Sequence, residues 1–442
     1  MKIHNSARIP GPKSKQIVFD SKKYVAKSNY VGLYGVALEK GNKSTVYDVD
    51  GNKYIDFLGG AAANILGYNN QEIIRAYQET ATKIHHSCTP YSLNAQVINL
   101  AKKLCNITNI IGDKAVMFGL TGSDSIDGAI KCARKYTNKK IIVSFEKSYH
   151  GQTGLSFKAS GFNKLSEHIF QRDNFIKVPF PRNREEAKEV IREIKIIFQN
   201  YPVAAFLIEP ILGDAGCIVP PDNFLKEITR MTTENNIILI DDEIQMGMGR
   251  TGKWFAYEHY GIEPDIIVIG KGLSSEYLPI SAVIGKKNII NSLDKAEHVF
   301  TYSAHPPSCA VASTVIDIME NQDIISNVVI QGIRLQKGLE KIKQDYPTIV
   351  KDVRGIGLSQ AVEINGVASL VGLRCLSYGL YPGYYGAKNE TLRLQPPLNI
   401  TGEEVNYAID VIRTVINEIY NNKIPEETKE LHKKYCLGLG VI

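Results

Sequence analysis

Residues 235–281 read NNIILIDDEIQMGMGRTGKWFAYEHYGIEPDIIVIGKGLSSEYLPIS and decide the fold. Two short β-branched apolar runs, Ile237–Ile240 and Ile266–Ile269, are bounded by polar residues or glycine, a pattern that predicts buried parallel strands. The first run leads into Asp241-Asp242-Glu243 and the second into Gly270-Lys271-Gly272. Because ligands of open α/β sheets bind outside the carboxyl ends of the strands, we expect these acids and this lysine to face a ligand.

An amine and a carboxylate at neighbouring strand ends form a pairing that pyridoxal phosphate (PLP) chemistry uses. A lysine acts as a Schiff-base nucleophile when burial lowers its pKa, and a buried carboxylate keeps the ring nitrogen of PLP protonated. The alternative is that Lys271 is a solvated lysine, as most lysines are, and that the acids cap a helix. Lys271 taken alone favours that alternative, so the choice depends on the rest of the chain.

Length and composition restrict the class of protein. The chain has 442 residues, 44% hydrophobic and 22% charged, which is typical of a globular protein of about three folding units. The net charge of +6 is not concentrated in a basic cluster with interleaved aromatics, and no apolar run approaches the ~20 residues of a membrane span. We therefore expect neither nucleic acid nor a membrane as a partner.

The cysteines and histidines indicate the compartment and exclude a metal. Seven cysteines, an odd number without a CxxC pair, favour reduced thiols in a cytoplasm. The cluster His85-His86-x-Cys88 has no second cluster to complete a ligand set, so we expect no metal site.

The order of predicted elements indicates an α/β fold. Strands and helices alternate from about residue 115 to 285, which predicts a mostly parallel sheet. Further strands are expected at Ile141–Phe145 and Val203–Ile208, and Val46–Phe57 reads as a hairpin around an Asp-Gly turn. The last third mixes helices with short strands, which predicts a smaller α+β unit.

These elements suggest a division of the chain. We expect an N-terminal arm and a segment of the small domain at residues 1–55, a large ligand-binding domain at 56–320, and the rest of the small domain at 321–442. The small domain is then built from both termini.

A phosphate site is predicted at Gly122-Ser123. Ile126, Ala129, Ile130 and Ala133 follow at helical spacing, so these two residues lie at the start of a helix. Free backbone N–H groups, the helix dipole and a hydroxyl bind phosphate at such a place. The alternative is that Ser123 is a plain N-cap with an acid in the first turn.

One glycine pattern matches a dinucleotide-binding motif but lacks the context that this motif requires. Gly247–Gly252 matches GxGxxG, but in dinucleotide-binding folds that motif lies directly in a strand-to-helix turn. Here Asp241–Met246 intervene, and no acid follows about 20 residues later at the next strand end. A nicotinamide dehydrogenase is therefore disfavoured, and a P-loop is absent.

Several short motifs together carry a family resemblance. In chain order they are Thr121-Gly122-Ser123-Asp124, Tyr149-His150-Gly151, Glu209-Pro210, Asp242-Glu243-Ile244-Gln245, Gly249-Arg250-Thr251-Gly252, Gly270-Lys271-Gly272 and Leu392-Arg393. Each motif is weak alone. In this order and spacing, the chain resembles the class III aminotransferase family of fold-type-I PLP-dependent transferases over nearly its whole length.

The resemblance implies a set of cofactor contacts. Lys271 would form the internal aldimine and then move protons at Cα, Asp242 would pair with the pyridinium nitrogen, Gln245 would bond the ring hydroxyl, Tyr149 would stack on the ring, and Gly122 and Ser123 would hold the phosphate. Every one of these contacts is an expectation carried over from the family.

The resemblance also implies partners. Thr301 would reach the PLP phosphate of a neighbouring subunit, so a homodimer with active sites at its interface is expected, and dimers that pair into tetramers stay open. Arg393 would bind the α-carboxylate of an amino-acid substrate in a bidentate clamp.

Three details favour an amino-acid racemase or 2-epimerase within the family. Asp214 stands where many family transaminases carry Glu, and the amino-acid racemases and isoleucine 2-epimerases are similar to this chain there. Residues 278–287 and 389–398 are similar to the epimerase-type sequences as well. Asp214 would act as, or orient, an acid/base on the face opposite Lys271, or else is a structural loop aspartate.

Other reactions stay open, because enzymes of this kind share a Cα carbanion (quinonoid) and the protein determines the fate of that carbanion. An aminotransferase with an amino-acid or ω-amine donor and 2-oxoglutarate or pyruvate as acceptor is the main alternative, and a decarboxylase is a further one. A catalytically inactive homologue is disfavoured because Lys271 and Asp242 are present. Arg393 argues for a free amino acid rather than a lactam as substrate.

The chain departs from the family pattern at two places. Ser274–Tyr277 replaces a Gly-rich turn after the lysine, and Ala304-His305-Pro306 replaces Gly-Asn-Pro. The first change leaves the substrate side chain open. Candidates for lining the substrate pocket are Tyr34, Tyr91, Glu276, Tyr277, Tyr384 and Tyr385.

Overall fold

The computed structural model describes residues 3, 5, 9–29, 32–162, 173–366, 368–386 and 389–436. The chain divides into two compact units. The smaller comprises Met1–Asn70, Ala215–Cys217 and Ser326–Ile442, and the larger comprises Gln71–Asp214 and Ile218–Ile325.

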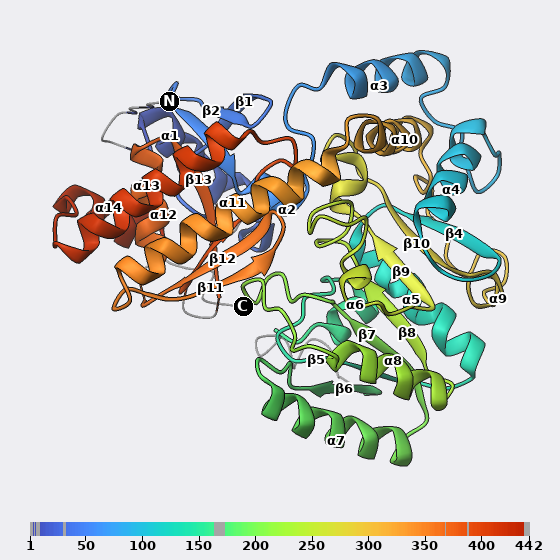
Figure 1. Ribbon diagram of the computed structural model, residues 1–442. Coiled ribbons are helices and arrows are strands. Elements are labelled where there is room, and N and C mark those ends of the chain that lie inside the picture. Colours follow the sequence, from blue (N-terminus) through green and yellow to red (C-terminus); the bar gives the residue numbers. More distant parts are fainter. Residues whose placement is uncertain are drawn as a thin grey trace. The chain divides into compact units, whose positions relative to one another are not determined.

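The larger unit is built on a seven-stranded sheet in the order β4-β10-β9-β8-β7-β5-β6 (Figure 1). Its strands are β4 (Lys114–Gly119), β5 (Ile141–Phe145), β6 (Phe175–Val178), β7 (Val203–Ile208), β8 (Ile238–Asp242), β9 (Ile266–Ile269) and β10 (Ser281–Lys286). Strand β8 pairs in parallel with β7 and with β9, which confirms the two strands predicted in the central stretch.

Strand β10 is the exception to the parallel order. It runs antiparallel to both β4 and β9, with Ala282 opposite Ile269 and Phe118. The chain turns back within the few residues after Lys271, too few for a helical crossover, so an antiparallel return is required. The expected mostly parallel sheet is confirmed, but this strand was not predicted.

Helices cover the sheet of the larger unit. They are α3 (Gln71–Lys83), α4 (Ala95–Ile107), α5 (Gly122–Thr137), α6 (Gly154–Ala159), α7 (Arg184–Asn200), α8 (Phe224–Glu234), α9 (Lys287–Ile290) and α10 (Pro306–Asn321). Helix α5 packs against β4 and β7 to β10, whereas α8 packs against β8. Ile126 and Ile130 of α5 are fully buried with Ile240 and Val268 in one core cluster. Each such burial contributes about 1.5–3 kcal/mol.

The smaller unit has a second seven-stranded sheet, in the order β1-β2-β3-β13-β14-β12-β11. Its strands are β1 (Leu38–Asn42), β2 (Thr45–Asp48), β3 (Lys53–Phe57), β11 (Val350–Ile356), β12 (Ser359–Ile364), β13 (Leu380–Tyr385) and β14 (Thr391–Leu394). Strands β2 and β3 are antiparallel, which confirms the predicted hairpin. Strand β3 pairs with β13, so the two ends of the chain share one sheet.

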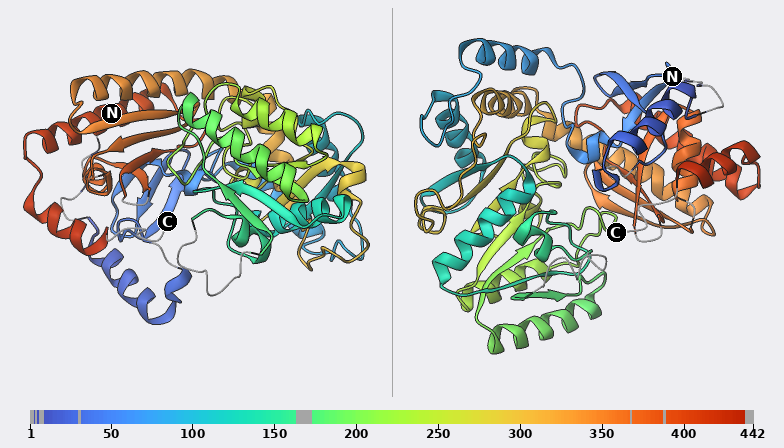
Figure 2. Two further views of the ribbon diagram at one scale, coloured as in Figure 1. Left: turned by 90° about the horizontal axis from the view of Figure 1, so that it is seen from below. Right: turned by 180° about the vertical axis from the view of Figure 1, so that it is seen from behind.

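The helices of the smaller unit are α1 (Pro12–Tyr24), α2 (Gly59–Ala62), α11 (Ile324–Asp345), α12 (Ala368–Ser377), α13 (Gly402–Tyr420) and α14 (Glu426–Tyr435). Figure 2 shows α11 running along one face of that sheet. Helix α1 lies within the N-terminal arm predicted at residues 1–30, of which residues 1, 2, 4, 6–8 and 30 lie outside the described ranges.

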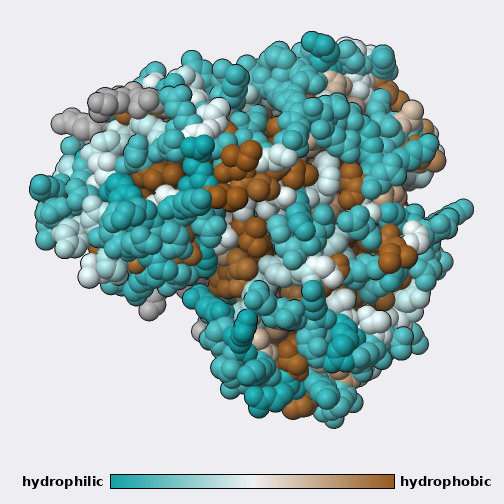
Figure 3. Space-filling model, in the orientation of Figure 1, coloured by the Kyte–Doolittle hydropathy of each residue, from teal (hydrophilic) through white to brown (hydrophobic). Residues whose placement is uncertain are grey.

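The surface is largely hydrophilic, and the cysteines are not joined in disulfides. Figure 3 shows hydrophilic residues over most of one face, with apolar residues in smaller patches between them. All seven cysteines are free thiols. None of the described helices combines the length and the apolar character that crossing a bilayer requires.

Burial in the larger sheet predicts a graded effect of truncation. Ile240→Ala removes a fully buried side chain from β8 and should lower the free energy of unfolding by about 2–5 kcal/mol. Ile196→Ala on α7, where the side chain is 59% exposed, should change it by no more than about 0.5 kcal/mol. Urea denaturation followed by circular dichroism measures both, and equal losses would contradict the assignment of the core.

Candidate active site

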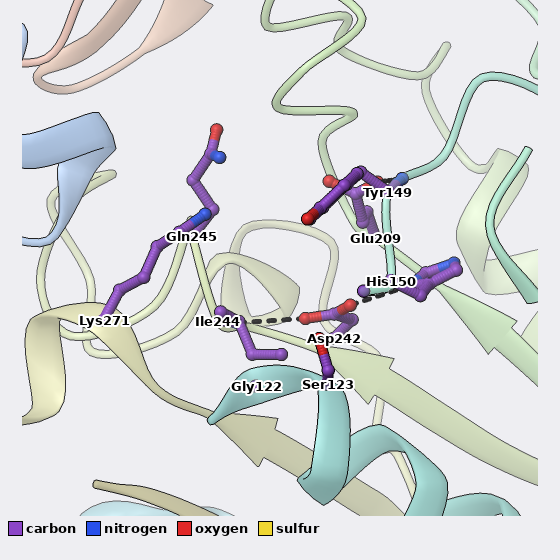
Figure 4. A pocket seen from close by; sticks show the side chains of 10 residues that line it. Gly122, Ser123, Tyr149, His150, Glu209, Asp242, Ile244, Gln245 and Lys271 are labelled. Atoms are coloured by element: carbon purple, nitrogen blue, oxygen red, sulfur yellow. Dashed lines mark hydrogen bonds and ion pairs between the residues drawn. The ribbon is translucent and has the colours of Figure 1, made fainter. Parts of the chain in front are cut away.

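A pocket of about 190 Å³ lies at the carboxyl ends of the parallel strands in the larger unit (Figure 4). Its lining residues are Gly122, Ser123, Tyr149, His150, Gly151, Glu209, Asp242, Ile244, Gln245 and Lys271. Every cofactor-binding residue predicted from the sequence, except Thr301, is in this set. The residues come from five separate strand ends or loops, which the sheet brings to one edge.

The N-terminus of α5 forms one end of the pocket. Thr121 is the N-cap: its Oγ1 accepts from the Asp124 N–H at 3.2 Å, and the Asp124 carboxylate accepts from the Thr121 N–H at 3.0 Å. The alternative that Ser123 is the N-cap is therefore wrong, because the helix begins two residues earlier. Gly122 and Ser123 occupy its first turn, where backbone N–H groups have no intrahelical partner.

Two glycines keep the space in front of that turn open. A Cβ on Gly122 would lie 2.6 Å from Ile244 Cδ1, and a Cβ on Gly151, whose φ is +127°, would collide with Ser123. The Ser123 hydroxyl also accepts from the Gln152 N–H at 3.2 Å. The loop after β5 and the start of α5 therefore form a close cradle of N–H and hydroxyl groups, suited to an anion.

A buried pair, Asp242 and His150, forms the centre of the pocket. His150 Nδ1 and Asp242 Oδ2 are 2.7 Å apart, and both side chains are almost fully buried. Burial lowers the pKa of His150, although Asp242 opposes the shift. The imidazole is then neutral and donates its Nδ1–H to the Asp242 carboxylate. Asp242 Oδ1 accepts from the Ile244 N–H at 3.1 Å, which fixes the carboxylate further.

Glu209 ties together the two loops that flank this pair. Its Oε1 accepts from the Tyr149 N–H at 2.7 Å, and its Oε2 accepts from the Gly213 N–H at 3.0 Å. Burial, and then the charges of Asp242 and Asp214, raise the pKa of Glu209 to about 8. One carboxyl group therefore sets the backbone of both the Tyr149 loop and the Asp214 loop.

Asp214 lies next to the pocket and is not part of its lining. The Gln245 side chain donates from Nε2 to Asp214 Oδ1 at 3.1 Å, and Gln245 itself lines the pocket. Burial, and then the Asp214 charge, raise the pKa of Tyr149. Asp214 thus acts on the pocket in two ways: through the Gln245 amide that it holds, and through the effect of its charge on Tyr149.

The three acids at the carboxyl end of β8, Asp241 to Glu243, do not all face the pocket, contrary to the expectation from the sequence. Side chains alternate along a strand, so Asp241 and Glu243 point away from the face that Asp242 lines. Both are buried, and Glu243 Oε1 accepts from the Tyr257 N–H at 2.8 Å. Burial and their mutual repulsion raise the pKa of Asp241 well above its usual range, and burial raises that of Glu243 to about 8.

Lys271 projects from the end of β9 into the pocket, as expected (Figure 4). Its φ is +36°, and Ser275 and Glu276 in the following turn also have positive φ values of +51° and +69°. This is the turn where the family pattern has glycines. Non-glycine residues there cost about 1–2 kcal/mol each.

The remaining predicted residues lie outside the described lining of this pocket. Thr301 is exposed in a turn of the larger unit. Arg393 belongs to β14 of the smaller unit, where its Cζ lies 3.3 Å from the centroid of the Tyr385 ring and 1% of the residue is exposed. Tyr34 and Tyr384 lie in the core of that unit and donate to the carbonyls of Pro382 and Leu33 respectively. Tyr91 is 88% exposed.

Sequence reasoning missed the roles of His150 and Glu209. Both stand in motifs that it singled out, beside Tyr149 and Pro210. Their partners are 92 and 60 residues away along the chain, so no local pattern discloses the contacts. The signal available was the residue types themselves, a histidine in the loop after β5 and an acid directly after β7.

The pocket fits PLP in the chemistry of its donors. A helix N-terminus with a hydroxyl suits the phosphate, an ionised buried carboxylate suits the pyridinium nitrogen, and a lysine amine suits the aldehyde. Fold and pocket together define a PLP-dependent enzyme of fold type I. The sequence profile of the family Aminotransferase class-III matches residues 25–416, and the chain belongs to this family, whose cofactor is PLP.

Named relatives carry more than one activity. An alanine/serine racemase of Pyrococcus horikoshii is 35% identical, over 96% of this chain and 94% of that protein. An isoleucine 2-epimerase of Lentilactobacillus buchneri is 30% identical, over 95% and 98%. A solved omega transaminase from Pseudomonas jessenii in complex with PMP superposes with a TM-score of 0.82 at 26% identity, covering 88% of this chain and 94% of that one.

Both side-chain oxygens of Glu209 accept from backbone N–H groups, so we expect PLP binding to require a carboxyl group at this position. In Glu209→Gln one oxygen becomes an NH2 group that faces a backbone N–H, so the Tyr149 and Gly213 loops lose one anchor. We expect PLP affinity to fall about tenfold or more, measured from the visible absorbance of the bound cofactor during dialysis, because one lost buried hydrogen bond costs about 1–3 kcal/mol. The matched control Glu189→Gln, exposed on α7, should leave it unchanged. Equal retention in both variants would contradict the anchoring role.

Proposed function

We propose that the chain is a PLP-dependent amino-acid racemase or 2-epimerase. The observation that carries this proposal is the place of Asp214, one hydrogen bond behind the pocket-lining Gln245. This is the position at which the sequence resembles racemases rather than most transaminases of the family. The similarity to a racemase and an epimerase over nearly the whole chain supports it.

In this proposal each pocket residue has one task toward the cofactor. Gly122 and Ser123 bind the phosphate at the N-terminus of α5, Tyr149 stacks on the ring, Gln245 bonds the ring hydroxyl, Asp242 pairs with the pyridinium nitrogen, and Lys271 binds the aldehyde carbon. His150 holds the Asp242 carboxylate in place. When bound, the cofactor supplies an electron sink for the carbanion at Cα.

The substrate is proposed to be a free α-amino acid. Arg393 would bind its carboxylate, because a guanidinium is planar and offers two parallel donors. The ring of Tyr385 already packs against that guanidinium and restricts its orientation. Arg393 and Tyr385 do not determine which side chain the substrate amino acid carries.

Racemisation requires two proton-transfer groups, one on each face of Cα. Lys271 would remove or return the proton on its own face. Asp214 would orient, through Gln245, the acid/base on the opposite face, where general acid–base catalysis contributes about 10²–10⁴-fold. Since Asp214 does not line the described pocket, orienting is the role that the geometry supports best.

An aminotransferase is the second candidate. The observation that favours it is the structural similarity to an omega transaminase at 26% identity, together with the Lys271 and Asp242 that both reactions need. The two reactions differ in one requirement: transamination needs a keto acid as acceptor, whereas racemisation does not.

Deuterium exchange separates the two reactions. PLP-loaded protein is incubated with single L-amino acids in D2O without a keto acid, and products are resolved by chiral chromatography and mass spectrometry. We expect the D-isomer, or the allo form of isoleucine, deuterated at Cα. Product formation only after addition of 2-oxoglutarate or pyruvate would overturn the racemase proposal in favour of the aminotransferase.

The same assay tests Asp214. Asp214→Asn should slow inversion about tenfold or more while Cα–H exchange with retention continues, because Lys271 still moves its own proton. Asp222→Asn is the matched control, since that carboxylate is largely exposed. Unchanged inversion in Asp214→Asn would make Asp214 a structural loop residue.

We further propose a homodimer in the cytoplasm, where its free thiols stay reduced. Segments 84–93 and 299–302 lie together, since the rings of His86 and Tyr302 stack at 4.7 Å. They expose the apolar side chains Ile84, Tyr91, Leu93, Val299 and Tyr302 around Thr301. Apolar patches of this kind mark protein interfaces.

Dimer formation is expected to support cofactor binding. Tyr91→Glu with Leu93→Glu should give a monomer in light scattering and weaken PLP retention, because charges replace two strongly exposed apolar side chains. Thr301→Ala should weaken PLP retention without changing the molecular mass of the dimer in light scattering. Phe19→Glu, 68% exposed on α1, serves as the control and should change neither. A wild-type monomer that retains PLP would contradict the proposal.

A further inference from the structure

A basic groove of about 490 Å³ lies at the C-terminal end of helix α5. The N-terminus of the same helix forms the candidate phosphate site, and its 16 residues separate the two ends by about 24 Å. The basic side chains that line the groove are Lys131, Arg134, Lys135, Lys139 and Lys140. The groove is therefore a feature distinct from the active-site pocket.

The acidic side chains near the groove neutralise only part of this charge. Lys135 pairs with Asp294 at 2.5 Å and with Glu297 at 2.7 Å. Among the described residues, no other carboxylate forms an ion pair with the cations of the groove. Five cations therefore face two carboxylates, and an excess of three positive charges is left.

Two of the other cations, Lys131 and Lys139, are held by neutral groups. Lys131 donates to the Glu297 carbonyl and Lys139 to the Asn236 carbonyl, both at 3.3 Å. The Lys140 ammonium makes no hydrogen bond or ion pair within the described part of the chain. Carbonyl dipoles orient these side chains without cancelling their charge, so the groove retains a positive field.

Arg134 makes two defined contacts in the groove. Its Nε donates to the Lys140 carbonyl at 2.8 Å, and its Cζ lies 5.0 Å from the centroid of the Phe175 ring. Burial lowers the pKa of Arg134, and its Nη2 is buried without a hydrogen-bond partner among the described residues. Nη2 is enclosed by protein, so Arg134 contributes its positive charge to the groove rather than this donor.

Helix capping does not account for the whole cluster. Cations in the last turn of a helix favour its dipole, which explains Arg134 and Lys135. Lys139 and Lys140 follow the helix and gain little from that effect, which falls off within one turn. Leu155 and Leu293 add an apolar part to the lining, which suits an organic ligand as well as an inorganic one.

We propose that this groove binds a small multivalent anion that carries two or more phosphate or carboxylate groups. Its volume is within the range of small-molecule sites, about 300–1,000 Å³. Two or more negative charges match the excess of positive charge in the groove. The proposal does not depend on which reaction the active site catalyses.

The test uses the PLP-loaded enzyme, so that the cofactor already occupies the active-site phosphate position. Inorganic pyrophosphate and citrate are titrated by calorimetry at a constant ionic strength of about 0.15 M, which screens unspecific attraction beyond about 8 Å. We expect saturable binding of one anion per chain with the visible absorbance of PLP unchanged. Tighter binding of pyrophosphate would assign a phosphorylated ligand, and tighter binding of citrate a polycarboxylate.

Charge-matched variants test the location. Arg134→Gln alone, and Lys139→Gln with Lys140→Gln beyond the helix, should each weaken binding tenfold or more. Lys102→Gln with Lys337→Gln removes two exposed charges elsewhere and should leave it unchanged. The double variant outside α5 keeps the test valid if Arg134→Gln does not fold. Absence of saturable binding, displacement of PLP, or an equal loss in the control would overturn the proposal.

Discussion

The hydrogen bond between Asp242 and His150 is the constraint on which the candidate active site depends. It joins the end of β8 to the loop after β5, with both side chains buried. A carboxylate buried in this way is costly unless it is paired. The neutral imidazole and the Ile244 N–H satisfy it without cancelling its charge. In the proposed function this carboxylate would face a cationic ring nitrogen, and Glu209 fixes the backbone of the two loops around it.

Much of this arrangement could be predicted from the sequence, because buried parallel strands are continuous apolar runs and their carboxyl ends meet at one edge. Ile237–Ile240 and Ile266–Ile269 form neighbouring parallel strands, which place Asp242 and Lys271 at the same edge of the sheet for that reason. The contacts of His150 and Glu209 could not be predicted, since they join distant strand ends through side-chain geometry. The antiparallel return of β10 is likewise decided by a short connection rather than by any periodicity.

Fold and cofactor do not determine whether the chain catalyses racemisation or transamination. Lys271, Asp242 and the α5 N-terminus are what every reaction of this family needs, so they do not discriminate between racemisation and transamination. The proposed distinction rests on Asp214, which is one methylene shorter than Glu and accepts a hydrogen bond from Gln245. The family resemblance points to this residue, and the structure adds the amide through which it would act. Arg393 belongs to the smaller unit.

The excess of buried acid carries a cost in stability that depends on pH. Glu209 and Glu243 have pKa values near 8 in the fold, against 4.5 for a free glutamate. Between these values the folded chain holds protons that the unfolded chain has released, so these groups lower the free energy of unfolding as pH rises from about 4.5 to about 8. A positive charge beside Asp242 and Glu209 would oppose that loss by lowering the pKa of Glu209. A PLP ring nitrogen bound as proposed would bring positive charge to this edge of the sheet and so reduce the cost of the acids at the ends of β7 and β8.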